Sequence, residues 1–456
     1  MQPETLPSQT GEIMERNRID VITLGCSKNL VDSERLMRRF EEHGYNVFHD
    51  SEDVKGEVVV INTCGFIGDA KEESINTILE YVQAKRQGRI LHLMVMGCLS
   101  QRYLTELKEE IPEVDRWYGK FNWTQLIDDL KIIHPPVMTT TCSKCADSLD
   151  RHITTPGHYT YLKISEGCNR FCAFCAIPLI TGRHTSVPIE RLEAEVRSLV
   201  ATGVKEFNLI AQDLSSYGLD IYGRMALPQL VERLAAIEGV EWIRLHYAYP
   251  AQFPMELLPV MASHTNVCSY LDIALQHISD RVLTNMRRHI TKDETIRLIR
   301  EIRRQVPGIH IRTTLMVGFP GEGESEFEEL KEFVRDTRFE RLGAFAYCEE
   351  EGTYSALHFD DEVPQDVKEA RLTEIMEIQE QISLELNEAK VGQTLRIIID
   401  REEEDYYVGR SEFDSPEVDP EVLVEKSRKL VPGRFCLVRI TTAMPFELIA
   451  TPISDT

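Results

Sequence analysis

The sequence lacks long hydrophobic runs. Among its 456 residues no stretch reaches the about 18 consecutive apolar residues that a membrane span needs, and the N-terminal region lacks the apolar segment of a secretory signal. Positive charge is also scarce, because 51 Lys and Arg stand against 75 Asp and Glu, giving a net charge of −24. This excess of negative charge disfavours nonspecific binding to nucleic-acid backbones and anionic lipids. We therefore expect a cytoplasmic protein that has no membrane partner.

Cysteine, by contrast, is plentiful. The chain has 11 cysteines, and a reducing cytoplasm disfavours a disulfide framework, so metal binding or catalysis is the expected role of closely spaced cysteines. Cys142 and Cys145 are predicted to be incidental thiols, with half of a zinc or redox site as the alternative, because no second Cys or His pair follows at zinc-finger spacing. Cys268, Cys348 and Cys436 lie in or beside apolar runs and are predicted core residues.

The N-terminal part of the chain alternates β-branched runs with amphipathic stretches, which is typical of a parallel α/β domain. Three of the predicted strands, at 19–24, 58–61 and 91–96, are each followed within three residues by a cysteine, namely Cys26, Cys64 and Cys98. Because the carboxyl ends of parallel strands share one edge of the sheet, these three thiols are expected to converge there. For any one of them alone, packing in the core is the alternative.

A second α/β series follows a proline-containing linker. Strand candidates alternate with helical patterns, which predicts a partial (β/α)6 barrel of the TIM type whose active face lies at the carboxyl ends of its strands. These candidates are 159–164, 207–211, 243–247, 270–275, 309–317 and 342–347. Short strands separated by turn signals then predict a small C-terminal antiparallel β-barrel. The expected domains of this α/β protein are a polar tail at 1–17, an N-terminal domain at 18–134, a linker at 135–156, the partial barrel at 157–386 and the small barrel at 387–456.

The most informative motif is a Cys-x3-Cys-x2-Cys triplet formed by Cys168, Cys172 and Cys175, in the loop after the first strand of the partial barrel. Three thiolates can bind three irons of a cubane cluster and leave the fourth iron open to another ligand, whereas a cluster held only by protein takes four cysteines. Zinc bound by these cysteines and a distant His184 is the alternative, since a structural zinc site closes with four ligands.

This spacing, on a loop that opens a β/α barrel, resembles the radical S-adenosylmethionine (SAM) superfamily. The resemblance implies that the open iron binds the methionine moiety of SAM, whose reductive cleavage yields a 5′-deoxyadenosyl radical. It also implies that Phe174 lies beside the adenine and that Gly318-Phe319-Pro320 lines the cofactor, with a plain turn as the alternative for the latter. Gln212 and Gln276 follow the second and fourth strands and are expected either to contact the cofactor or only to close hydrogen bonds.

Taken together, the three-cysteine α/β domain, the radical SAM core and the small barrel resemble the methylthiotransferases, whose TRAM domain matches the barrel. The motifs Gly25-Cys26-Ser27-Lys28-Asn29, Asn62-Thr63-Cys64-Gly65-Phe66-Ile67 and Pro178-Leu179-Ile180-Thr181-Gly182-Arg183 resemble the branch of this family that modifies a ribosomal protein. The tRNA-modifying branch typically has Gln-Met-Asn after the first cysteine. The resemblance covers nearly the whole chain.

Membership of that branch implies a reaction and a set of partners. The thiols of Cys26, Cys64 and Cys98 would hold a second [4Fe-4S] cluster, at which sulfur from a sulfur donor is methylated by one SAM. The radical from a second SAM would remove hydrogen from the β-carbon of an aspartate in small-subunit ribosomal protein S-twelve, with electrons from a reducing donor. No acid or base residue is expected, because this C–H bond carries no acidic proton.

Three further expectations concern partners and alternatives. The net negative charge favours a basic protein substrate over tRNA, so no direct tRNA substrate is expected. We also expect a monomer. The alternatives are a tRNA adenosine methylthiotransferase and a noncatalytic iron–sulfur scaffold or electron carrier.

Overall fold

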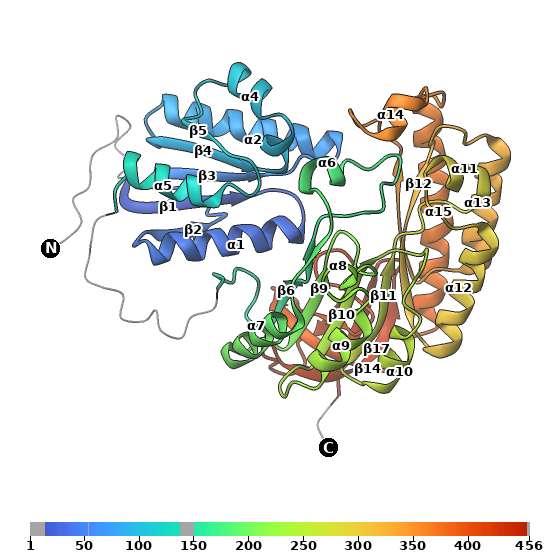
Figure 1. Ribbon diagram of the computed structural model, residues 1–456. Helices are drawn as coiled ribbons and strands as arrows, with labels where there is room; N and C mark the ends of the chain where they lie inside the picture. The colour runs from blue at the N-terminus through green and yellow to red at the C-terminus, as the bar shows by residue number, and fades with distance from the viewer. Residues whose placement is uncertain (1–13, 53, 137–149, 454–456) are drawn as a thin grey trace. The chain divides into compact units, whose positions relative to one another are not determined.

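The computed structural model describes residues 14–52, 54–136 and 150–453. Cys142 and Cys145, in the predicted linker, lie outside the described residues, as does most of the predicted N-terminal tail. The chain forms two compact units, one comprising Met1–Thr154 and Ala176–Arg183 and the other Thr155–Cys175 and His184–Thr456 (Figure 1). Within the described residues, no helix is both long enough and apolar enough to cross a membrane.

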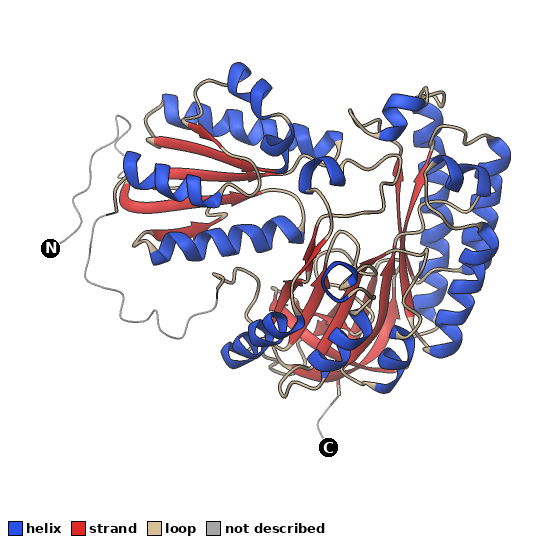
Figure 2. Ribbon diagram, viewed as in Figure 1, coloured by secondary structure: helices blue, strands red, loops and turns tan. Residues whose placement is uncertain are grey.

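The first unit is built on a five-stranded parallel sheet in the order β2-β1-β3-β4-β5, whose strands are labelled in Figure 1 and drawn in red in Figure 2. Its strands are β1 (Glu15–Thr23), β2 (Asn46–His49), β3 (Gly56–Thr63), β4 (His92–Gly97) and β5 (Arg116–Trp117). Every residue of the central strand β3 is buried, as its continuous hydrophobic run requires in a parallel sheet that is covered on both faces. The sequence did not predict β2 and β5, which lie at the two edges of the sheet; β2 is partly exposed and β5 has only two residues.

Helices cover both faces of this sheet. Apolar side chains of α1 and α5 pack on one face, and those of α2, α3 and α4 pack on the other. The short helix α6, which follows the second cysteine triplet in the chain, belongs to this unit and packs against α3. The bounds are α1 (Ser27–Glu42), α2 (Gly68–Arg86), α3 (Cys98–Arg102), α4 (Leu104–Glu110), α5 (Trp123–Ile133) and α6 (Ile177–Thr181).

The second unit contains the predicted partial barrel, and all six predicted strands are present. They form a parallel sheet in the order β13-β12-β11-β10-β9-β6, so each strand pairs with the next of these six along the chain. The strands are β6 (Tyr159–Lys163), β9 (Glu206–Ile210), β10 (Trp242–Ala248), β11 (Val267–Ile273), β12 (His310–Val317) and β13 (Arg341–Ala346). A short antiparallel pair, β7 (Ser165–Glu166) and β8 (Thr185–Ser186), flanks the cysteine triplet.

The connections of this unit run through helices on the outside of the sheet (Figure 1). Their bounds are α7 (Ile189–Thr202), α8 (Leu219–Tyr222), α9 (Leu227–Ala235), α10 (Leu257–Ser263), α11 (Asp280–Asn285), α12 (Lys292–Gln305), α13 (Glu324–Thr337), α14 (Tyr354–His358) and α15 (Gln365–Glu388). Local sequence explains where they begin. For example, α12 starts at a capping box in which Thr291 accepts from the Glu294 amide and the Glu294 carboxylate accepts from the Thr291 amide.

The C-terminal strands close into a five-stranded barrel in the order β14-β15-β16-β18-β17. They are β14 (Thr394–Glu402), β15 (Tyr406–Ser411), β16 (Glu421–Glu425), β17 (Phe435–Ala443) and β18 (Glu447–Pro452). The predicted α/β fold with a small C-terminal barrel is confirmed, but the barrel is not wholly antiparallel, because β16 pairs in parallel with β18. Sequence patterning missed β16, whose five residues follow a proline and carry a glutamate at each end.

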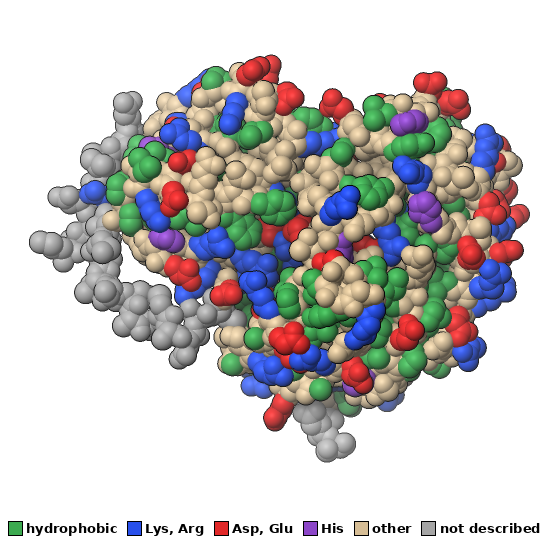
Figure 3. Space-filling model, viewed as in Figure 1, with side chains coloured by type: hydrophobic (Ala, Val, Ile, Leu, Met, Phe, Trp, Pro, Cys, Tyr) green, Lys and Arg blue, Asp and Glu red, His purple; other side chains and the backbone are tan. Residues whose placement is uncertain are grey.

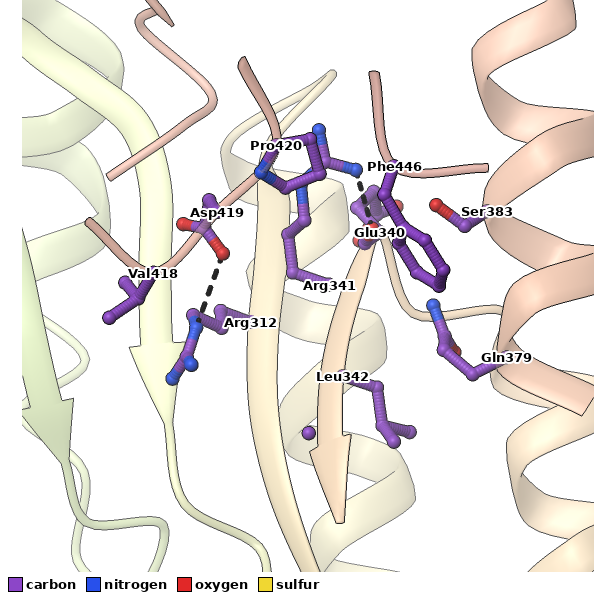
Figure 4. A pocket seen from close by; sticks show the side chains of 11 residues that line it. Arg312, Glu340, Arg341, Leu342, Gln379, Ser383, Val418, Asp419, Pro420 and Phe446 are labelled. Carbon is purple, nitrogen blue, oxygen red and sulfur yellow. Dashed lines mark hydrogen bonds and ion pairs between the residues drawn. The ribbon is translucent and has the colours of Figure 1, made fainter. Parts of the chain in front are cut away.

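The barrel packs against the amino-terminal ends of the core strands. A cavity of about 190 Å³ opens where the barrel meets β12, β13 and α15 (Figure 4). Arg312 donates to Asp419 at 3.3 Å in its wall, and Phe446 lies at its rim. None of the predicted site residues lines this cavity, so it is separate from the cysteine-bearing loops at the other end of the strands.

Candidate functional site

The first predicted triad, Cys26, Cys64 and Cys98, lies at the carboxyl edge of the first unit's sheet, where the residues follow β1, β3 and β4. Gly25 permits a close approach there, because a Cβ on it would lie 2.7 Å from the Cβ and 2.8 Å from the Sγ of Cys64. Burial raises the pKa of the Cys98 thiol to about 12, and the neighbouring Cys26 and Cys64 thiols contribute to the increase. The three thiols therefore share one local environment.

Two buried side chains organise this edge. Asn29, on the first turn of α1, donates from Nδ2 to the carbonyls of Leu24 at 3.0 Å and Thr63 at 3.1 Å, and its Oδ1 accepts from the Cys98 Sγ at 3.5 Å. Lys120, only 2% exposed, places its Nζ 3.8 Å from the Cys98 Sγ. Asn29 therefore ties two strand ends to one thiol, and Lys120 supplies positive charge that favours a thiolate.

We expect Gly25→Ala to damage this edge. Gly25 has a φ of +90°, which costs a residue with a side chain about 1–2 kcal/mol, and the contact with Cys64 adds about 1–3 kcal/mol. Urea unfolding should show a loss of about 3 kcal/mol. Gly88→Ala is the matched control, because Gly88 also has a positive φ but a Cβ there would meet nothing within 4 Å. Equal losses in the two variants would contradict the proposed contact.

The second predicted triad, Cys168, Cys172 and Cys175, lies in the loop between β7 and β8 of the second unit. Cys168 and Cys172 are buried and Cys175 is partly buried. Burial raises the pKa of the Cys168 thiol to about 12, and the Cys172 thiol contributes to the increase. The amide of Arg170 donates to the Cys168 Sγ at 3.4 Å, and the amide of Cys175 donates to the Cys172 carbonyl at 3.1 Å.

Polar atoms without partners surround this triad. Arg170 bonds through its Nε to Asp213 at 2.6 Å, and Gln212 donates to Glu166 just before the triplet. Among the described residues, Arg170 Nη2, Gln212 Oε1 and Arg288 Nε are buried and have no hydrogen-bond partner. Because buried polar groups are normally paired, these atoms fit a site that is completed by a polar ligand.

The predicted cofactor contacts are brought together only in part. The rings of Phe174 and Phe319 meet edge to face, with centroids 6.3 Å apart. Gly318 has a φ of +75°, and its amide donates to the carboxylate of Glu322 at 2.9 Å, so this segment is a turn at the end of β12. The carbonyl of the adjacent Pro320 accepts from an asparagine on α11.

The main chain of Gln276 forms hydrogen bonds with β12. Its amide donates to the Thr314 carbonyl at 2.8 Å and its carbonyl accepts from the Met316 amide at 2.7 Å, so the residue extends the pairing with β12. The main chain of Gln276 therefore closes hydrogen bonds with β12, and a contact between its side chain and the cofactor stays a prediction.

The zinc alternative finds no support. Across the described ranges, no group of three His, Cys, Asp or Glu side chains is arranged to hold a single metal ion. His184 instead faces Ser186, with 3.0 Å between Nε2 and Oγ. A cubane cluster does not require its three thiolates to converge on one ion, because each binds a different iron.

Sequence reasoning erred at one of the other cysteines and missed two cations. Cys268 is buried as predicted, but Cys348 is exposed and Cys436 is only partly buried, because both lie near strand ends at the surface. Lys120 and Arg288, the buried cations beside the two triads, were not anticipated. Their charge gives no hint of burial, since their partners lie far away in the chain.

Family models match three parts of the chain. They are described as "Uncharacterized protein family UPF0004" at residues 18–119, "Radical SAM superfamily" at 162–334 and "TRAM domain" at 391–453.

Curated relatives match nearly the full length and share one name, "Ribosomal protein uS12 methylthiotransferase RimO". The protein of Parabacteroides distasonis is 61% identical, covering 95% of this chain and 99% of its own length. That of Bacteroides thetaiotaomicron is 60% identical, covering 96% and 98%. That of Christiangramia forsetii is 50% identical, covering 97% and 96%.

Solved structures share the fold at low identity. The radical SAM methyltransferase TsrM from Kitasatospora setae matches with a TM-score of 0.53 at 15% identity, covering 73% of this chain and 72% of that one. The cobalamin-dependent SAM radical enzyme OxsB matches with a TM-score of 0.52 at 13% identity, covering 80% and 56%. These likenesses concern the fold alone.

Proposed function

Because the chain belongs to the RimO family of ribosomal protein uS12 methylthiotransferases, we propose that it attaches a methylthio group to the β-carbon of an aspartate in uS12. It is a radical SAM enzyme of the transferase class, and it uses SAM and an iron–sulfur cluster. The observation that supports this function most directly is the presence of a cysteine triad in each of the two units, one at a strand-end edge and one in the loop between β7 and β8.

We propose two clusters. Cys168, Cys172 and Cys175 would hold the first, and the orphaned polar atoms around them fit a polar cofactor. The triad of the first unit would hold the second, beside the Asn29 amide and the Lys120 ammonium. When bound, the clusters supply reductive cleavage of SAM and a place to methylate sulfur, and each leaves one iron without a protein ligand.

The protein's own residues position these groups rather than transfer protons. Phe174 and Phe319 present an apolar wall beside the second triad, and Phe319 is fully buried. Abstraction of hydrogen from an unactivated carbon needs no side-chain base. We therefore assign no acid or base residue, and we propose an external sulfur donor and an external reducing electron donor as partners of a monomeric enzyme.

Charge supports a basic protein substrate. Residues 322–390 contain 21 Asp and Glu but only 7 Lys and Arg. The two basic residues of α15, Lys368 and Arg371, are buried and paired with Asp361 and Glu322. Figure 3 shows acidic side chains at the surface over α13, with basic ones interspersed. Such a surface attracts a Lys- and Arg-rich ribosomal protein and repels tRNA phosphates, and a ribosomal substrate implies a cytoplasmic location.

An anaerobic assay with two competing substrates tests this function. The reconstituted enzyme would be incubated with SAM, a sulfide source and a low-potential reductant, together with either purified uS12 or unmodified tRNA. We expect mass spectrometry to find one methylthio group on a uS12 aspartate and none on tRNA adenosine.

The outcomes separate the alternatives. Modification of tRNA without modification of uS12 would support the tRNA methylthiotransferase instead. Absence of both 5′-deoxyadenosine and product, in protein with bound iron and sulfide, would support a noncatalytic iron–sulfur carrier.

A further inference from the structure

Arg288 is a buried cation in direct contact with a cysteine of the second triad. The residue is only 3% exposed, and its Nη1 donates to the Cys172 Sγ at 3.2 Å. Its Nη2 donates to the carbonyl of Ala274, and its guanidinium carbon lies 4.2 Å from the ring centroid of Tyr249. Among the residues that the structure describes, none forms a hydrogen bond with its Nε.

The backbone fixes this position. The segment after α11 is tied to the cysteine loop, because the amide of Ala173 donates to the Met286 carbonyl at 2.9 Å. The Tyr249 hydroxyl donates to the carbonyl of Arg288 itself at 2.7 Å. Arg287, the preceding residue, points the other way: it is exposed, and its guanidinium stacks on Tyr354 instead. Two adjacent arginines therefore have opposite environments.

The charge of Arg288 lacks the usual compensation. Among the described residues, no Asp or Glu side chain forms an ion pair with it, whereas Arg170, whose guanidinium carbon also lies 4.2 Å from the Tyr249 centroid, is paired with Asp213. A buried charge is costly unless it meets an opposite charge or hydrogen-bond acceptors. The anionic group that the structure places against Arg288 is the sulfur of Cys172, once that thiol is deprotonated in a cluster.

We propose that Arg288 is a positioning residue that holds the Cys172 sulfur and raises the reduction potential of the cluster bound by Cys168, Cys172 and Cys175. This inference rests on the proposed function, because it requires a cluster at that triad. Reduction adds one negative charge to the cluster. A buried cation and a hydrogen bond to a ligating sulfur both stabilise the reduced state more than the oxidised state, and these are the factors that set cluster potentials.

A redox titration followed by electron paramagnetic resonance tests this directly. The full chain would carry Cys26→Ala, Cys64→Ala and Cys98→Ala, so that only the second triad binds a cluster. In this background, we expect Arg288→Met and Arg288→Gln to disfavour reduction at least tenfold, a shift of 59 mV or more to lower potential for a one-electron couple.

Two variants serve as controls. Arg287→Met removes an equal charge from the adjacent, exposed position and should leave the potential unchanged, because solvent screens it. Arg288→Lys keeps the charge, so the equilibrium constant for reduction of its cluster should stay within tenfold of that of the parent.

The iron content of each sample separates the possible failures. A bound cluster whose potential is unchanged in both neutral Arg288 variants would overturn this inference and leave the proposed function intact. Equal shifts in Arg287→Met and Arg288→Met would also overturn it, since the effect would not depend on the buried contact. Absence of any iron in the parent protein would overturn the proposed function together with the inference.

Discussion

Replacing Cys168, Cys172 and Cys175 together with Ala is expected to abolish both 5′-deoxyadenosine formation and uS12 modification. These thiols are the only cysteines in the loop between β7 and β8, so no neighbouring thiol there can substitute. The iron content measured under anaerobic conditions should fall from about eight to about four per chain, because one of the two proposed cubane sites is lost. Chromatography of SAM products measures the loss of cleavage.

The matched variant replaces Cys26, Cys64 and Cys98 with Ala. It should also retain about four irons, but it should still cleave SAM while forming no methylthio product, because the two triads are assigned different steps. Cys348→Ala, at an exposed cysteine that belongs to neither triad, should behave like the parent. Retention of uS12 modification in either triple variant, or loss of zinc without loss of iron, would contradict the assignment.

Glu206→Ala is expected to lower the free energy of unfolding of the second unit by about 3–5 kcal/mol. Glu206 is fully buried where the barrel meets the core sheet, and Arg410 on β15 contacts it at 2.8 Å. Arg244 on β10 contacts its other oxygen at 3.2 Å. Removal of the carboxylate leaves two buried guanidinium groups short of negative charge. The midpoint of urea unfolding, followed by circular dichroism, measures this loss.

An exposed ion pair across the same junction is the control. Glu241 contacts Arg396 at 2.6 Å, but both side chains are close to half exposed, so Glu241→Ala should cost only about 0–1 kcal/mol. Similar costs for the two variants would show that the buried network does not hold the barrel in place.

Low pH should reproduce part of the destabilisation that Glu206→Ala causes. Burial alone would raise the pKa of Glu206. The positive charges of Arg410 and Arg244 lower it by more, so the pKa lies below the ordinary value of 4.5. A carboxylate with a depressed pKa stabilises the folded state above its unfolded pKa, and that contribution is lost as pH falls through the folded pKa. The stability difference between the parent and Glu206→Ala should therefore shrink in acid below pH 4.5.

Much of the architecture follows from local patterns. The runs that form β1, β3 and β4, and the six strands of the core, are apolar enough to be recognised one by one. The strands that were missed, β2, β5 and β16, are short and lie at edges or next to turns, where neighbouring strands rather than their own residues decide that they pair. The parallel pairing of β16 with β18 is of the same kind, since it depends on how the barrel closes.

The two cysteine triads were evident in the sequence because thiol spacing and strand ends are local features. The family of the chain likewise follows from its sequence, through identity to its relatives. Only the tertiary structure decided which buried cation contacts which anionic group. Arg288 meets a sulfur 116 residues away, and Arg410 meets a carboxylate 204 residues away. The physical reason is that a charge can be buried only where packing delivers its partner, and no local pattern records which distant strand or loop will do so.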